Sequence, residues 1–142
     1  MTAVAFHFNV PDKLGYTCRL LRKVYRSGKR AVVVGEPAQL DQLTRRLWEF
    51  DPQDFIPHVR LKSSEATERM RPTPLWLADQ ARSAPDCDVL INLGGMSPEG
   101  CEAFERLIEI VSTDEADLQR ARGRWKQYAA EGWSIEKFEV PA

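Results

Sequence analysis

The run AVVVG at residues 31–35 constrains the fold of this chain more than any other feature of its sequence. A strand that is β-branched and apolar on both faces is typical of a parallel sheet covered by helices on both sides. Similar patterns predict strands over 3–9, 74–78, 87–93 and 106–112, helices over 12–28, 40–50 and 114–131, and a polar loop over 62–73. Their order predicts a Rossmann-like, three-layer α/β/α fold with a mostly parallel central sheet.

Length and composition narrow the class of protein. We expect residues 1–142 to form a single α/β domain, because 142 residues is an ordinary size for one hydrophobic core. A formal net charge of -1 does not favour non-specific binding to duplex DNA. The absence of a long apolar run and of a secretory signal predicts a cytoplasmic protein without a membrane contact. Three cysteines without C-x-x-C spacing are predicted to be reduced core thiols.

The sequence lacks the short motifs of common enzymes. It contains neither a G-x-S-x-G elbow nor a G-x-x-x-x-G-K-[ST] phosphate loop, so we expect no catalytic residues, no cofactor and no metal. One alternative stays open, because Gly94 and Gly95 follow a predicted strand and could let backbone amides approach a phosphate. Together with Asp12 and Glu36 at the same sheet edge, they would define a nucleotide- or phosphate-binding α/β enzyme.

The segment ARGRWKQYAAEGW at 121–133 is unusual for a helix that only packs. Gly123 costs about 1 kcal/mol relative to alanine in a helix interior. At helical spacing Arg122 and Lys126 line the edge of an apolar stripe, and the stripe consists of Leu118, Ala121, Trp125 and Tyr128. Two further cations are Arg124 within this segment and Arg120 directly before it.

Three interpretations of this segment stay open. The stripe could belong to the core with solvated cations beside it, or it could be a receptor for a ligand that is both acidic and apolar. In the second case Gly123 would leave room for the ligand to approach closely. Cations beside stacking aromatic rings also suit direct binding of single-stranded nucleic acid, although the net charge disfavours that activity.

A second unusual feature is Trp48, which lies about 120° from the apolar stripe of its predicted helix. The loop DFIPH that follows contains Phe55 and Ile56 where polar residues are usual. An exposed aromatic cluster predicts a protein interface, whereas contact between Trp48 and Phe55 would make it a small satellite core.

These segments carry a resemblance to a known family. YRSGKRAVVVGEPAQLDQLTRRLWEFDPQDFIPH at 25–58 and LQRARGRWKQYAAEGW at 118–133 resemble the chi subunit of bacterial DNA polymerase III, and the resemblance covers nearly the whole chain. It implies a non-catalytic accessory subunit of the clamp loader, within an assembly that is a DNA-directed DNA polymerase, a nucleotidyltransferase. Such a subunit bridges the clamp loader, through the psi subunit, to the acidic C-terminal tail of single-stranded DNA-binding protein during DNA replication. DNA is reached only indirectly, through the assembly.

The resemblance also implies two binding sites. The tail site would comprise Arg122, Trp125 and Lys126 with Val111 and Tyr128 nearby, and the psi site would comprise Trp48, Phe55, Ile56 and Pro57. Two positions depart from the family pattern: Trp125 replaces a familiar tyrosine, and Ala129 stands where another cation can occur. We therefore expect one ionic contact fewer and a tail site that is either weaker or differently shaped.

Overall fold

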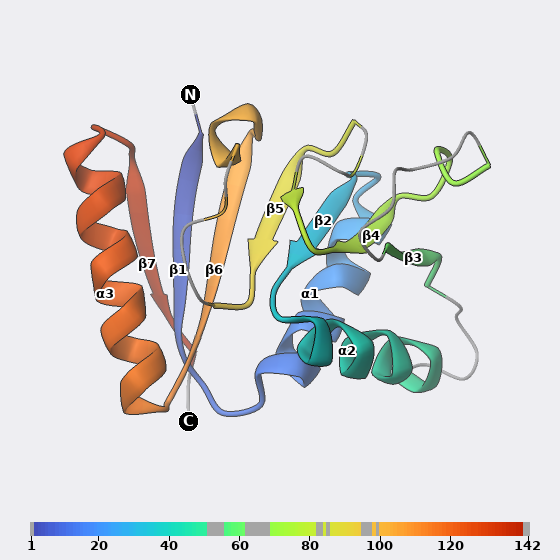
Figure 1. Cartoon of the computed structure of the whole chain (residues 1–142), viewed down its shortest axis with the longest axis horizontal. Helices are drawn as coiled ribbons and strands as arrows, with labels where there is room; N and C mark the ends of the chain where they lie inside the picture. The colour runs from blue at the N-terminus through green and yellow to red at the C-terminus, as the bar shows by residue number, and fades with distance from the viewer. Residues whose placement is uncertain are drawn as a thin grey trace.

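The structure, a computed structural model, describes residues 2–50, 56–61, 69–81, 84, 86–94, 98 and 100–140, and of Phe50 it describes the backbone alone. Its seven strands form one sheet in the order β3-β4-β2-β5-β6-β1-β7 (Figure 1). All neighbouring strands in this order are parallel. The strands are β1 (Ala3–Val10), β2 (Ala31–Val34), β3 (His58–Leu61), β4 (Leu75–Ala78), β5 (Val89–Asn92), β6 (Arg106–Ser112) and β7 (Ile135–Glu139).

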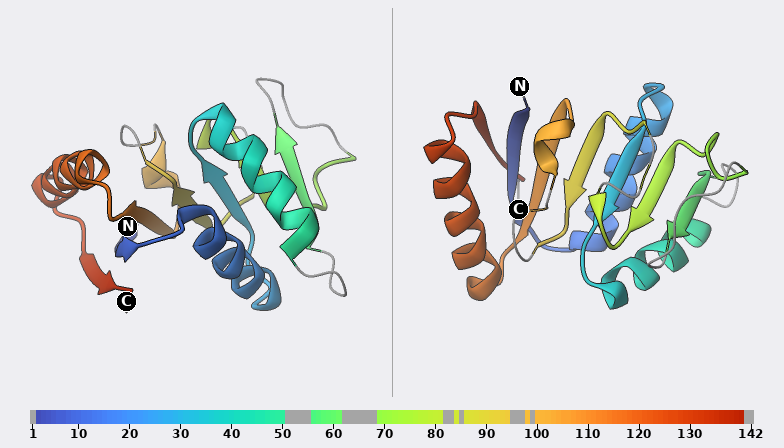
Figure 2. Two further views of the ribbon diagram at one scale, coloured as in Figure 1. Left: turned by 90° about the horizontal axis from the view of Figure 1, so that it is seen from below. Right: turned by 45° about the horizontal axis from the view of Figure 1, so that its top comes forward.

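Helices cover both faces of the sheet. They are α1 (Lys13–Arg26), α2 (Pro37–Phe50), α3 (Glu115–Ala130) and the short η2 (Cys101–Ala103). In the left view of Figure 2, α1 and α2 lie side by side, and α3 lies apart from them. This arrangement confirms the predicted three-layer α/β/α fold.

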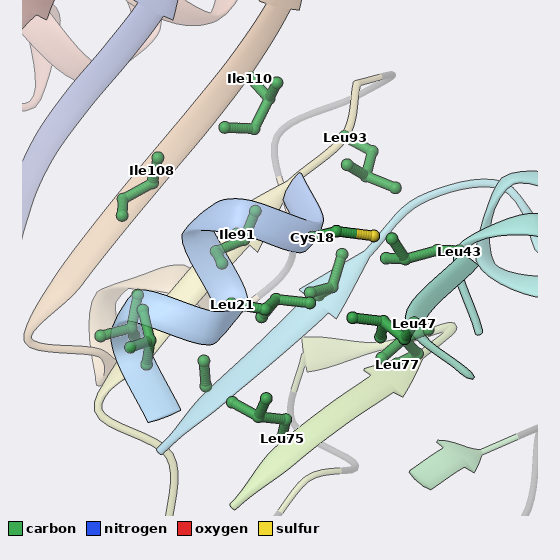
Figure 3. Close-up of a cluster of buried hydrophobic side chains, with 14 of the residues drawn as sticks. Cys18, Leu21, Leu43, Leu47, Leu75, Leu77, Ile91, Leu93, Ile108 and Ile110 are labelled. Atoms are coloured by element: carbon green, nitrogen blue, oxygen red, sulfur yellow. The ribbon is translucent and has the colours of Figure 1, made fainter. Parts of the chain in front are cut away.

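Two apolar clusters occupy the two faces. Val33 of β2 packs with α1 and α2, around Leu21 and Leu43, in the cluster of Figure 3. Its neighbours Val32 and Val34 face the opposite side and pack in the second cluster with residues of α3. Because successive side chains of a strand point to opposite faces, an apolar run such as AVVV is required where both faces are covered.

Two strands, β3 and β7, were not predicted from the sequence. Both form edges of the sheet, where one side has no neighbouring strand. The sequence of β7, IEKFE, is mostly exposed and charged, and charged residues are common on edge strands because they discourage pairing with another chain. Such a strand lacks the apolar pattern that revealed the central ones.

The three cysteines are free thiols, as predicted. Burial raises the pKa of Cys18 to about 11, that of Cys87 to about 12 and that of Cys101 to about 11. Cys18 and Cys101 are core residues, whereas Cys87 is half-buried.

Candidate functional site

A groove of about 750 Å³ runs between α3 and the edge of the sheet formed by β1 and β7. Figure 1 shows α3 alongside this edge. The volume lies in the range of small-ligand and peptide-anchor sites, roughly 300–1,000 Å³. The residues lining this α3–β7 groove are Phe8, Asn9, Ser112, Thr113, Leu118, Gln119, Arg122, Gly123, Trp125, Lys126, Lys137 and Glu139.

Aromatic rings form the floor of the groove. The ring of Trp125 packs on Phe6 with centroids 4.9 Å apart and on Phe8 with centroids 6.2 Å apart. Trp125 is only partly buried, and its remaining surface lines the groove. It therefore packs against the core and also lines the groove.

Cations stand on two sides of this floor. Arg122 and Lys126 are exposed and lie one turn apart on α3. On the β7 side the Nζ atom of Lys137 lies 5.5 Å from the centroid of the Phe8 ring, and 3.7 Å from the carboxylate of Glu139. Phe8 was not predicted as a groove residue, although its strand was predicted, and Lys137 and Glu139 were not predicted because β7 was not. The two apolar residues of IEKFE do not alternate with the charged ones, so no local pattern marked this strand.

Gly123 lies on the exposed side of α3 and lines the groove. Apart from its chain neighbours and the backbone of α3 itself, a Cβ atom built at this position would meet no described atom within 4 Å. Packing within the described part of the chain therefore does not require glycine here.

Val111 and Tyr128, expected near the tail site, are buried beneath the groove rather than in its lining. The Tyr128 hydroxyl donates a hydrogen bond of 2.7 Å to Glu109, and its ring stacks on Trp133 with centroids 5.4 Å apart. Arg124, which the sequence grouped with the exposed cations, is also buried and donates to Glu109 over 3.1 Å. The basic surface of α3 therefore lacks Arg124.

Burial raises the pKa of Glu109, while Arg124 and Tyr128 act in the opposite direction. Glu109 is a residue of β6, so these two bonds join the middle and the end of α3 to the centre of the sheet. They fix the rotation of α3 about its axis and thereby the direction of its exposed cations.

The start of α3 is held by a second polar cluster. Asp114 caps the helix by accepting a bond from the backbone N–H of Asp117. The Asp117 carboxylate accepts bonds from the backbone and the hydroxyl of Ser112, each 2.8 Å long, and forms an ion pair of 2.7 Å with Lys13. Burial alone would raise the pKa of Asp117, but the bonds from Lys13 and Ser112 outweigh it and hold that pKa below the ordinary value.

Gly94, the one described residue of the glycine loop predicted for the alternative enzyme, lies next to this ion pair. Gly94 has a φ of +138°, and a Cβ atom there would lie 3.2 Å from Asp117 and 3.3 Å from Lys13. Lys13 also donates to the Leu93 carbonyl. Gly95 lies outside the described residues. Lys13 is thus already engaged within the chain.

The two carboxylates that were predicted to act with this loop are Asp12 and Glu36. Asp12 caps α1 by accepting from Gly15, and Arg46, 2.9 Å away, holds the pKa of Asp12 below its ordinary value. Glu36 is exposed at the start of α2. Within the described ranges, no group of three His, Cys, Asp or Glu side chains is arranged to hold a metal ion.

The second predicted surface lies at the opposite edge of the sheet. Trp48 is 63% exposed, and its ring meets that of His58 edge-on with centroids 5.8 Å apart. Pro57 is half-buried. Ile56, expected at this surface, is instead a core residue that is 1% exposed, because it packs with the cluster under α1 and α2. Phe55 lies outside the described residues.

The fold and groove define a three-layer α/β/α protein with a ligand-sized groove beside its last long helix. The chain belongs to the DNA polymerase III chi subunit family, since residues 1–136 match the family described as "DNA polymerase III chi subunit, HolC". It is 37% identical over 127 residues to the DNA polymerase III subunit chi of Haemophilus influenzae, covering 87% of this chain and 84% of the relative. It is 30% identical over 147 residues to the subunit of that name from Pseudomonas aeruginosa, covering 99% of each.

A solved structure shares the fold. Domain 2 of the DEAD-box helicase Mss116p, bound to an RNA duplex, superposes with a TM-score of 0.59 at 8% identity. The match covers 99% of this chain, which spans 64% of the helicase chain. At this identity the likeness shows the fold alone. In the described part of the chain, none of the helices has the length and apolar character needed to cross a membrane.

Proposed function

We propose that this protein is a non-catalytic accessory subunit of the DNA polymerase III holoenzyme in the cytoplasm, and that it bridges two partners during DNA replication. The α3–β7 groove binds the acidic C-terminal tail of single-stranded DNA-binding protein. The surface around Trp48, with Phe55 and Pro57, binds the psi subunit of the clamp loader. The observation that carries the proposal is the groove itself, in which two exposed cations of α3 border a partly buried aromatic floor.

The chemistry of the groove matches an acidic peptide that ends in an aromatic residue with a free carboxylate. Arg122 can pair with a carboxylate through two parallel bonds, and Lys126 adds a second positive charge one turn later. Trp125 and Phe8 offer apolar surface to the terminal ring. Each charge-assisted bond contributes about 1.5 to 3 kcal/mol, as does burial of a phenylalanine ring. Since ordering a flexible tail offsets several kcal/mol, we expect binding in the micromolar range or weaker.

The bridging role is supported by the placement of the two surfaces. Trp48 belongs to α2, which contacts β3 at one edge of the sheet, whereas the groove lies at β7, the other edge. Figure 1 shows α2 and α3 at opposite ends of the molecule. This separation of the two surfaces supports a bridging role, since a partner at one edge does not cover the other surface.

The experiment is a titration of a fluorescently labelled acidic tail peptide against the wild-type protein, Arg122→Ala and Lys126→Ala. We expect each variant to lose about tenfold or more in affinity, and a peptide without its terminal aromatic residue to bind more weakly still. Arg19→Ala is the matched control, because it removes one positive charge from α1, away from the groove. Affinity in all variants should fall as salt rises from about 0.05 to 0.5 M. Equal affinity for wild type, Arg122→Ala and Lys126→Ala would refute the tail site.

A further inference from the structure

β7 contributes charges to the same groove from the side opposite α3. Lys137 pairs in register with Phe6, and Glu139 pairs in register with Phe8. Because alternate residues of a strand share a face, Lys137 and Glu139 both point to the face covered by α3. Both line the groove, opposite Arg122 and Lys126.

The two residues of β7 form a weak ion pair. Their side chains are 57% and 69% exposed, and Nζ of Lys137 lies 3.7 Å from Oε1 of Glu139. A strong charge-assisted bond is about 2.7–2.9 Å long. Exposed pairs of this kind contribute little to stability and are readily exchanged for another carboxylate. The cations of α3 differ, since within the described ranges neither Arg122 nor Lys126 forms an ion pair.

We propose that Lys137 is a third cation of the peptide site and that Glu139 acts as an internal competitor, which occupies Lys137 until a carboxylate of the bound peptide displaces it. This inference rests on the proposed function of the groove. While no ligand is bound, Glu139 partly neutralises the positive charge that Lys137 brings to the groove. The empty groove is thereby less attractive to stray monovalent anions, and a ligand must bring enough negative charge to release Lys137.

The arrangement specifies the ligand more narrowly than α3 does alone. Positive charges stand on both sides of an aromatic floor, so the best ligand is a peptide with acidic residues that reach both sides and an apolar side chain between them. A peptide with a terminal carboxylate as its single negative charge can satisfy the α3 side alone and leaves the Lys137–Glu139 pair intact.

The test is a double-mutant cycle at about 50 mM salt with the labelled acidic peptide and the variants Lys137→Met, Glu139→Gln and Lys137→Met/Glu139→Gln. Methionine keeps an apolar stem over Phe8 while it removes the charge. We expect Lys137→Met to weaken binding about two- to fivefold and Glu139→Gln to tighten it by a similar factor. In the Lys137→Met background the gain from Glu139→Gln should largely disappear.

Glu136→Gln is the matched control, because it makes the same charge change on the opposite face of β7 and does not line the groove. We expect its affinity to equal that of the wild type. The competitor role of Glu139 would be refuted if the gain in affinity from Glu139→Gln persisted in full in the Lys137→Met background. It would also be refuted if Glu136→Gln produced the same gain. Unchanged affinity in Lys137→Met, with Arg122→Ala still impaired, would overturn the inference but leave the proposed function standing. If neither Arg122→Ala nor Lys137→Met weakened binding, both the inference and the proposed function of the groove would be overturned.

Discussion

The Nε atom of Arg124 donates to Oε2 of Glu109 across 3.1 Å, and the two side chains are only 3% and 0% exposed. Arg122, two residues earlier on the same helix, is exposed in the groove. Two residues correspond to about 200° of rotation on a helix, so an inward Arg124 requires an outward Arg122. The buried ion pair thus determines which face of α3 the groove presents.

Removing one partner of this pair should destabilise the protein strongly. We expect Glu109→Leu to lower the free energy of unfolding by about 3 to 5 kcal/mol, because it removes the buried carboxylate that pairs with Arg124 and accepts from the Tyr128 hydroxyl. Urea denaturation followed by circular dichroism measures the change. The double variant Glu109→Leu/Arg124→Leu should recover most of the loss. A cost below about 1 kcal/mol for Glu109→Leu alone would contradict this view of α3.

Asp117 should make stability depend on pH. Its folded-state pKa lies below the ordinary value of 3.8, so its ionised form stabilises the fold. This contribution is complete above about pH 5 and is lost as the pH falls below about 4, toward the folded-state pKa. We expect Asp117→Asn to cost about 2 to 3 kcal/mol at pH 7, because a charge-assisted pair with Lys13 is lost. Denaturation of both proteins between pH 3 and 7 should show this difference narrowing below pH 4, and an equal difference at pH 3 and 7 would exclude the mechanism.

Gly123→Ala should separate folding from binding. The new methyl group meets no described atom within 4 Å beyond its chain neighbours and the backbone of α3, so alanine should stabilise α3 by about 0.5 to 1 kcal/mol. The same methyl group stands in the groove, where it should obstruct a closely bound peptide. We expect a raised midpoint of unfolding together with weaker binding of the tail peptide. A variant that is more stable and binds as well as the wild type would show that no ligand uses the space above Gly123.

Trp48→Ala tests the opposite surface. Because Trp48 is 63% exposed, its loss should change the free energy of unfolding little, by about 0.5 to 1 kcal/mol at most. A tryptophan at the centre of an interface typically contributes 2 kcal/mol or more, so the complex with psi should weaken about thirtyfold while tail binding is unaffected. Phe138→Ala, which removes another large apolar side chain that is exposed, is the matched control and should leave the psi complex intact. Analytical ultracentrifugation or titration with purified psi decides between a true interface and a satellite core.

Much of the candidate site was visible in the sequence, for reasons that are local. Arg122 and Lys126 are four residues apart on a strongly predicted helix, and this spacing alone places them on one side of it. Trp48 likewise departs from the period of its own helix and is exposed as expected. Arg124 was misplaced, because its burial depends on Glu109, a residue of another element, and helical period carries no information about such a partner.

By itself, the sequence determined the architecture of this protein and one wall of its groove. A strand as apolar as AVVV must be covered on both faces, and alternation with helices leaves few arrangements other than a parallel three-layer fold. Tertiary structure alone decided that IEKFE pairs with β1, that Lys137 and Glu139 thereby face α3, and that Arg124 turns inward to Glu109. The physical reason is that strand pairing at an edge and burial of a charge both depend on contacts between residues distant in the chain. Such contacts leave little trace in the local pattern of a segment whose residues are otherwise suited to solvent.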